Sequence, residues 1–211
     1  MHIPDGFLDA KTWGPLWAVS AAGVGAAARR ARARLDDRTI PLLGVTAAFV
    51  FAAQMLNFPV AGGTSGHFTG GALSAILLGP SAGILAMSSV LTIQCLVFQD
   101  GGLTALGANA FNMAIAGCLS GWAVWRALTA VFGRRLRTAS VFLAAWSSVV
   151  LAASLCAVEL GLSGTVPLKP ALAAMAGVHA VIGLVEGAVT AAVLELVWKV
   201  RPDLAETGGA R

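Results

Sequence analysis

Charged side chains are scarce in this chain. Of its 211 residues, 11% are charged and 57% are apolar, and the mean hydropathy is +0.81. Soluble domains carry about a quarter charged residues, so this chain lacks the polar groups needed to cover a water-facing surface. The composition excludes a sizeable soluble domain. It predicts one integral membrane domain, because several apolar runs approach the roughly 20 residues that span a bilayer.

The sequence also lacks the signatures of disulfide frameworks and of common enzymes. Its three cysteines, Cys95, Cys118 and Cys156, lie in apolar runs without Cys-x-x-Cys spacing, so we interpret them as packing residues. No Gly-Lys-Ser/Thr phosphate loop, His-Glu-x-x-His pair or Gly-x-Ser-x-Gly elbow occurs. Any use of ATP must therefore come from a partner. No basic region precedes a short apolar core, so we expect no cleaved signal peptide and a mature start at Met1.

The apolar runs predict an all-α integral membrane protein with seven transmembrane helices. The runs cover about residues 12–28, 40–58, 72–98, 107–131, 139–161 and 171–198. Gly79-Pro80 divides the third run into two passes, because proline ends a helix at the residue before it. The first of these two passes is short.

Basic residues set the predicted orientation. They cluster at positions 29–38, 126–137 and 199–211, and cytoplasmic loops are enriched in Lys and Arg. Seven passes place all three clusters in the cytoplasm, with the N-terminus outside and the C-terminus inside. We therefore expect a single membrane domain over residues 1–198, with a metal-binding segment at 1–8 and a loop at 59–71, followed by a cytoplasmic tail at 199–211.

The first residues, Met1-His2-Ile3-Pro4-Asp5-Gly6-Phe7, carry a candidate metal site. The terminal amine of Met1, the amide nitrogen of His2 and its imidazole can close around one metal ion as two fused chelate rings. Nitrogen ligands suit Ni(II), Co(II) and Cu(II). The alternative is a frayed chain end with a chance histidine.

His67 is the candidate for a fourth nitrogen ligand. It lies in the glycine-rich loop 59–71, on the same predicted side of the membrane as Met1. Glycine permits backbone conformations and close approaches that other residues resist. A loop that folds over a bound ion needs both.

Further polar residues in the apolar runs could support these ligands. Amides beside membrane spans either bond between helices or orient metal ligands through hydrogen bonds. His179 and Glu186 lie seven residues apart on one face of the last predicted helix. They are either a buried structural pair or, for His179, a support for the metal loop. The candidate supporting residues are Asn57, Asn109, Asn112 and His179.

The opening segment, Pro59-Val-Ala-Gly-Gly-Thr-Ser-Gly-His67, Leu78-Gly79-Pro80 and the stretch from Asp100 to Asn109 resemble the substrate-capture subunit of cobalt/nickel energy-coupling-factor (ECF) transporters, the CbiM/NikM family. The resemblance implies a seven-helix subunit that binds Co(II) or Ni(II) from outside through Met1, His2 and His67. It also implies a bacterial or archaeal cell membrane. The implied partners are a transmembrane coupling subunit, two cytoplasmic ATP-binding subunits and a small accessory membrane protein.

We therefore predict a metal-capture subunit of an ABC importer with no catalytic residues and no bound cofactor, the metal being cargo. Two alternatives remain open. A metal-dependent intramembrane enzyme would need an open coordination position and a general base. An unpowered metal channel would show several weaker sites along a pore. The start Met-His-Ile-Pro-Asp-Gly without a signal leans towards nickel over cobalt.

Overall fold

The computed structural model describes residues 1–33, 36–37, 39–60 and 64–204. Residues 61–63 of the predicted loop and 205–211 of the predicted tail lie outside the described residues. Within the described part the fold is helical, with one short antiparallel hairpin. The elements are α1 (Ala10–Arg32), α2 (Thr39–Gln54), β1 (Phe58–Val60), β2 (Thr64–Gly66), α3 (Gly71–Leu78), α4 (Pro80–Phe98), α5 (Leu106–Asn109), the π-helix η1 (Ala110–Ala116), α6 (Gly117–Phe132), the 3₁₀ helix η2 (Gly133–Leu136), α7 (Arg137–Leu162) and α8 (Leu168–Val200).

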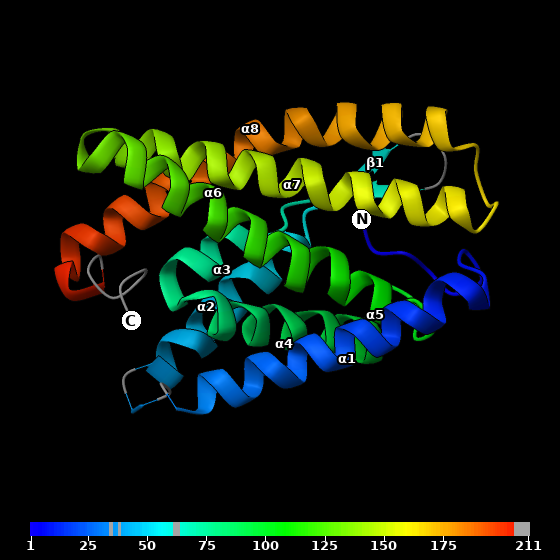
Figure 1. Cartoon of the computed structure of the whole chain (residues 1–211), viewed down its shortest axis with the longest axis horizontal. Coiled ribbons are helices and arrows are strands. Elements are labelled where there is room, and N and C mark those ends of the chain that lie inside the picture. The colour runs from blue at the N-terminus through cyan, green and yellow to red at the C-terminus, as the bar shows by residue number, and fades with distance from the viewer. Residues whose placement is uncertain (34–35, 38, 61–63, 205–211) are drawn as a thin grey trace.

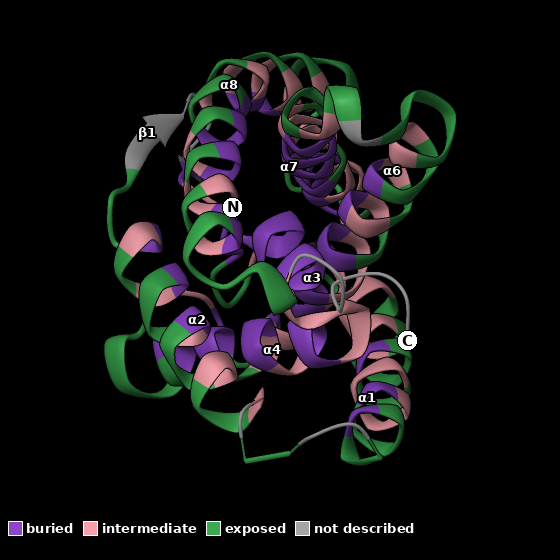
Figure 2. Ribbon diagram, turned by 90° about the vertical axis from the view of Figure 1, so that its left-hand side faces the viewer, coloured by how far each residue is buried: buried purple, intermediate pink, exposed green. Residues whose placement is uncertain are grey.

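The shortest of the main helices, α3, lies at the centre of the bundle. It packs against α4, α6 and α7, and residues 71–77 are all buried. Around it, α7 runs along α8 and α6 packs on α7 (Figure 1). Buried residues face inward and exposed residues face outward on most helices (Figure 2). The core therefore surrounds α3 and the residues that lead into it.

The predicted break at Gly79-Pro80 is present. Helix α3 ends before Gly79, which has a φ of 82°, and α4 begins at Pro80. Proline suits the first helical position, where its missing N–H would have no partner in the helix. Gly83 then lies against α3, because a Cβ there would be 2.8 Å from the Cα of Ala75. The two helices turn back on one another as the sequence indicates.

The helices have the character of a membrane protein. Four described helical stretches are long and apolar enough to cross a bilayer: 80–98, 106–132, 137–162 and 168–200. Large apolar side chains on their outer faces, such as Val181 and Leu196, are more than 60% exposed, as expected for a lipid-facing surface. Helix α2 is apolar but shorter. Helix α3, with eight residues, is about 12 Å long against about 30 Å of hydrocarbon. The count of seven complete spans therefore stays a prediction.

Most of the described basic residues gather at one end of the bundle. Figure 1 shows the end of α1, the start of α7 and the end of α8 together at that end. Arg29, Arg30 and Arg32 lie in the last turn of α1, and Lys199 lies in the last turn of α8. Arg137 at the start of α7 pairs with Glu195 at 2.9 Å. The charge distribution thus distinguishes the two ends of the molecule.

The contact between Gly83 and α3 gives a test of the fold. In Gly83→Ala the new methyl group meets the backbone of Ser74 and Ala75 at 2.8–2.9 Å. Overpacking of this kind costs about 1–3 kcal/mol. We expect a lower thermal unfolding midpoint of the protein in detergent. Gly44→Ala in α2 is the control, because a Cβ there meets nothing within 4 Å. That variant should match or slightly exceed the wild type, since alanine favours helix. A midpoint for Gly83→Ala at or above that of Gly44→Ala would contradict the packing.

Candidate metal centre

The N-terminus of the chain is buried inside the protein. Met1 is 2% exposed, His2 7% and Ile3 1%. In both views the N-terminus lies within the bundle, below α7 and above α1 in Figure 1. A frayed end would be exposed to solvent, so the interpretation of His2 as a chance residue on a loose end does not hold.

Asn109 pairs with the backbone of Ile3. The Ile3 N–H donates to Oδ1 of Asn109 at 2.8 Å, and Nδ2 of Asn109 donates to the Ile3 carbonyl at 3.1 Å. The same carbonyl accepts from the Gly102 N–H at 2.8 Å. Buried backbone groups need such partners, because an unpaired one costs about 1–3 kcal/mol. Asn109 therefore holds the residue next to His2, and its role in supporting a metal ligand stays a prediction.

Asp5 fastens the segment to the loop between α4 and α5. Its carboxylate accepts from the backbone N–H groups of Leu103 at 3.0 Å and Thr104 at 2.7 Å, and from the Thr104 hydroxyl. The two stretches of chain are so close that a Cβ on Gly102 would be 2.2 Å from the Asp5 nitrogen. Only glycine fits at position 102. The stretch Asp100-Gly101-Gly102, which the sequence analysis interpreted only by its family resemblance, packs against the N-terminal segment and binds it.

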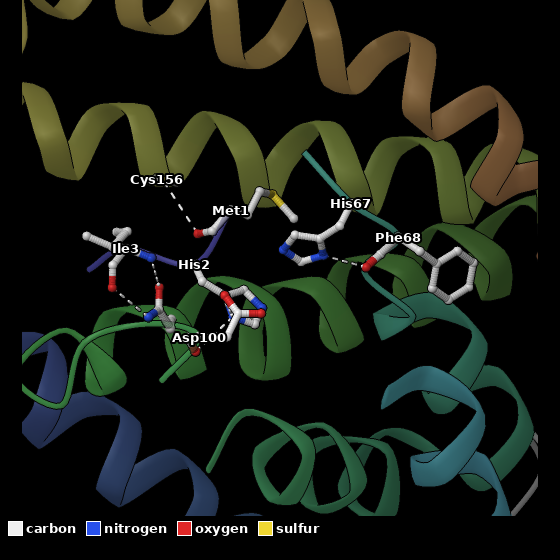
Figure 3. A network of polar contacts seen from close by, with 8 residues as sticks. Met1, His2, Ile3, His67, Phe68, Asp100 and Cys156 are labelled. Atoms are coloured by element: carbon white, nitrogen blue, oxygen red, sulfur yellow. Dashed lines mark hydrogen bonds and ion pairs between the residues drawn. The ribbon is translucent and has the colours of Figure 1, made fainter. Parts of the chain in front are cut away.

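The imidazoles of His2 and His67 meet inside the bundle. Their ring centroids are 4.6 Å apart and the rings are nearly perpendicular. Figure 3 shows Met1, His2 and His67 gathered in one place, with Asp100 next to His2 and Phe68 next to His67. The structure thus brings together the three residues that the sequence analysis chose as metal ligands, from two segments more than sixty positions apart.

Hydrogen bonds orient both rings. Nδ1 of His67 donates to the Phe68 carbonyl at 2.7 Å. Nδ1 of His2 lies 3.1 Å from the Asp100 carbonyl and 3.2 Å from its carboxylate. A carbonyl can only accept, so each Nδ1 carries a proton. Burial lowers the pKa of His67, so its Nε2 keeps its lone pair. Among the described residues, neither buried Nε2 has a hydrogen-bond partner. For His67 this pattern, with Nδ1 held by a carbonyl and Nε2 without a partner, is typical of metal-ligating histidines.

Burial keeps two of the candidate ligand groups, the Met1 amine and the His67 imidazole, uncharged. Burial lowers the pKa of the Met1 amine to about 6, against a smaller opposing effect of Cys156 and Asp100. Burial also lowers the pKa of His67 well below its usual value, helped by the nearby amine and His2. At neutral pH both groups are therefore mostly free bases. A metal ion would meet lone pairs without displacing protons from these two groups.

The described side chains alone do not supply enough ligands for a metal ion at this site, so main-chain nitrogens are needed. Within the described ranges, no cluster of three or more His, Cys, Asp or Glu side chains is arranged to hold a metal. Two imidazoles alone are too few for a closed site, so the amine and the His2 amide are the additional nitrogens at hand. Chelation through the His2 amide uses Nδ1 of the same residue. That atom now contacts Asp100, so it must turn from Asp100 towards the ion.

The remaining candidate supporting residues lie in different places. His179 is fully buried in α8, and its Nδ1 donates to the Met175 carbonyl at 2.7 Å. Asn112 donates to Glu159 of α7 at 2.7 Å, which is a bond between helices. Asn57 is exposed after the end of α2, whereas the candidate ligands Met1, His2 and His67 are buried. Asn109 is the candidate that forms hydrogen bonds with the N-terminal segment.

Two carboxylates at the site were not identified as such from the sequence. Asp100 contacts His2 from the α4–α5 loop, and this hydrogen bond lowers the pKa of Asp100. Glu186 of α8 binds the backbone just after His67. Asp100 entered the sequence analysis only as part of the family resemblance, and Glu186 was interpreted as a structural residue paired with His179. The seven-residue spacing from His179 was a signal for Glu186.

Comparison with known proteins gives the family of this chain. The family of cobalt uptake substrate-specific transmembrane regions, CbiM, matches residues 2–204. The chain belongs to this family. A putative metal transport protein of Haloquadratum walsbyi is 48% identical over 98% of this chain and 94% of its own length. A putative fused nickel transport protein NikMN of Archaeoglobus fulgidus is 49% identical over 100% of this chain and 70% of its own length. The crystal structure of a truncated transition metal transporter has a TM-score of 0.89 and 31% identity, over 94% of this chain and 99% of that chain.

Membership in the CbiM family gives the general function. The chain is a substrate-specific membrane component of cobalt/nickel transport and a multi-pass protein of a prokaryotic cell membrane. It is a transporter component rather than an enzyme, and the metal is its transported substrate. The resemblance inferred from the sequence is confirmed.

The pairing of Asn109 with Ile3 can be tested by substitution. Asn109→Leu keeps a buried side chain of similar size but removes both hydrogen bonds to Ile3, so the N-terminal segment loosens. We expect Ni(II) affinity to fall by about 10–100-fold, as for other residues that orient metal ligands. Isothermal titration calorimetry on the detergent-solubilised protein measures it. Asn57→Leu, the same change at an exposed position, should leave the affinity unaltered. Equal affinities for the two variants would show that Asn109 does not support the site.

Proposed function

We propose that this chain captures one Co(II) or Ni(II) ion through four nitrogens: the Met1 amine, the His2 amide, the His2 imidazole and the His67 imidazole. The observation that carries the proposal is the buried N-terminus beside the His2–His67 pair. These groups are buried, close together and, for the amine and His67, depleted of protons. Nitrogen sets of this kind suit Ni(II), Co(II) and Cu(II), and the relatives named for nickel and cobalt transport support the first two.

Capture then proceeds in defined steps. The Met1 amine and Nε2 of His67 replace water molecules bound to the ion, because these two nitrogens already have a free lone pair. The His2 ring turns, so that Nδ1 leaves Asp100 for the ion, and the His2 amide loses its proton. The carboxylate of Asp100 remains beside the site and offsets part of the charge of the ion. The proton on Nδ1 of His2 moves to Nε2 of the same ring, and the amide proton is released, so acid should weaken binding.

We propose that the metal site opens towards the outside of the cell. The basic ends of α1, α7 and α8 lie together at one end of the bundle, and Lys and Arg are enriched on the cytoplasmic side. The N-terminus is then external and the C-terminus cytoplasmic. Seven passes result if residues 66–70 enter the bundle and α3 completes the crossing. Burial of His67, Thr69 and α3 supports this path.

We further propose that the chain works in an ECF-type importer. The sequence has no phosphate-binding loop of its own, and a tight site needs a source of energy to release its ion inward. A membrane coupling subunit and two cytoplasmic ATP-binding subunits would supply it, with a small accessory membrane subunit. The fused nickel transport proteins among the relatives are longer than this chain.

Extension of the chain by one residue is the sharpest test of the chelate. A serine placed before Met1 moves the amine away from the ion and leaves both histidines in place. The added serine would have no space beside Met1, because Met1 is buried, with only 2% of its surface exposed. We expect Ni(II) and Co(II) binding to be lost in calorimetric titrations. The control carries the same serine after Arg211, at the other end of the chain. Unchanged affinity in the amino-terminal extension would disprove the proposed ligand set.

Removal of His67 should have a smaller effect. In His67→Ala three of the four nitrogens remain, and water can fill the fourth position. We expect weaker Ni(II) binding that is still measurable, together with a change in the visible absorption bands of the bound ion. If His67→Ala bound Ni(II) with the affinity and spectrum of the wild type, His67 would not be a ligand. A metal-bound water in the wild type would instead favour the enzyme alternative.

A further inference from the structure

Glu186 of α8 binds the backbone that follows His67. Its Oε2 accepts from the Thr69 N–H at 2.6 Å, and its Oε1 accepts from the Thr69 hydroxyl at 2.6 Å and from the Gly70 N–H at 2.9 Å. The carboxyl group is 1% exposed and lies in the middle of a helix of 33 residues. A carboxylate in this position is costly unless it serves a function or a specific partner. Here all three donors come from two loop residues.

The other side of the same residues is held by α2. Nε2 of Gln54 donates to the Thr69 carbonyl at 2.7 Å. Gly70 has a φ of 78°, and a Cβ there would be 2.7 Å from the methyl groups of Val50. Thr69 and Gly70 are therefore fixed between a helix near the start of the chain and the last helix. His67, two residues earlier, bonds through Nδ1 to the Phe68 carbonyl, in the peptide that joins Thr69.

We propose that Glu186 is a positioning residue for the metal site: by fixing Thr69 and Gly70 it places the His67 imidazole beside His2. The proposal rests on the proposed function, because it assigns Glu186 a role in metal capture. It makes α8 the element that controls the fourth ligand. Movement of α8 relative to α2 would withdraw His67 while the amino-terminal chelate, held by Asn109 and Asp5, stays in place.

The isosteric change Glu186→Gln removes this control with little change in shape. Backbone N–H groups can only donate, and one faces each oxygen of the carboxylate. A glutamine has one oxygen and one NH₂ group. Whichever way it turns, its NH₂ group faces the N–H of Thr69 or of Gly70. The loop backbone must then shift, and His67 shifts with it.

The matched control is Glu195→Gln in the same helix. Glu195 also accepts three hydrogen bonds, from Nε and a terminal nitrogen of Arg137 and from the Thr138 hydroxyl. It lies at the basic end of the bundle, far along α8 from the ligands. We expect Glu186→Gln to weaken Ni(II) binding by about 10–100-fold and to give the absorption spectrum of His67→Ala. Glu195→Gln should bind as the wild type does.

A double substitution separates positioning from general stability. If Glu186 acts through His67, adding Glu186→Gln to His67→Ala should cause no further loss of Ni(II) affinity, because coupled residues are not additive. A purely structural role predicts losses that multiply. Multiplying losses, or a wild-type affinity and spectrum for Glu186→Gln, would overturn the proposal.

Thr69→Val provides the same test if Glu186→Gln fails to fold. It removes the hydroxyl bond and keeps both backbone bonds, so the loss of affinity should be smaller but again absent in the His67→Ala background. Failure of the proposed function has a different result: the serine extension before Met1 would leave metal binding intact. Suppose instead that the serine extension abolishes metal binding, while Thr69→Val and Glu186→Gln bind Ni(II) as the wild type does. That result would refute the role of Glu186 and leave the proposed function standing.

Discussion

A chain terminus can lie inside a membrane protein only if its backbone groups find partners there. The two hydrogen bonds between Asn109 and Ile3 meet this requirement, and the Gly102 N–H completes it. The proposed metal site depends on this interaction, because it fixes the residue next to His2 and keeps the Met1 amine buried. Burial in turn lowers the pKa of the amine. The hydrogen bonds that satisfy the Ile3 backbone thus also hold the Met1 amine where it is uncharged, as the proposed ligand must be.

The helices could be predicted from the sequence because apolar runs and their interruptions are local signals. The break at Gly79-Pro80 is an example, since glycine and proline act on their own backbone. The central position of α3 and the π-helix η1 could not be predicted. Eight apolar residues do not reveal whether they lie in lipid or inside a bundle. The π-helix η1 begins directly after Asn109, and its Ile115 lies against Gly23 of α1, a contact between residues distant in the sequence.

The same distinction separates the predicted and the missed parts of the site. Met1, His2 and His67 could be chosen because their chemistry is evident from residue type and from position in the chain. Asp100 and Glu186 could not be assigned, because their partners are 98 and more than 110 positions away. A carboxylate that accepts from backbone N–H groups leaves no complementary side chain to find in the sequence. Asn57 was an unsupported candidate for the opposite reason: its position before the loop was close in sequence but exposed in space.

The proposed ligand set divides into two parts that different elements hold. The amine, the amide and the imidazole of the first two residues are held by the α4–α5 loop and α5, through Asp5 and Asn109. The imidazole of His67 is held by α8 and α2, through Thr69. A four-nitrogen site that released its ion in one step would have to break every bond together. A divided site can lose one ligand first, when the two parts separate, and the ion then faces an open coordination position. Tight capture and release are compatible in such a site, because the fourth bond is controlled by the packing of a helix rather than by the affinity of the ligand.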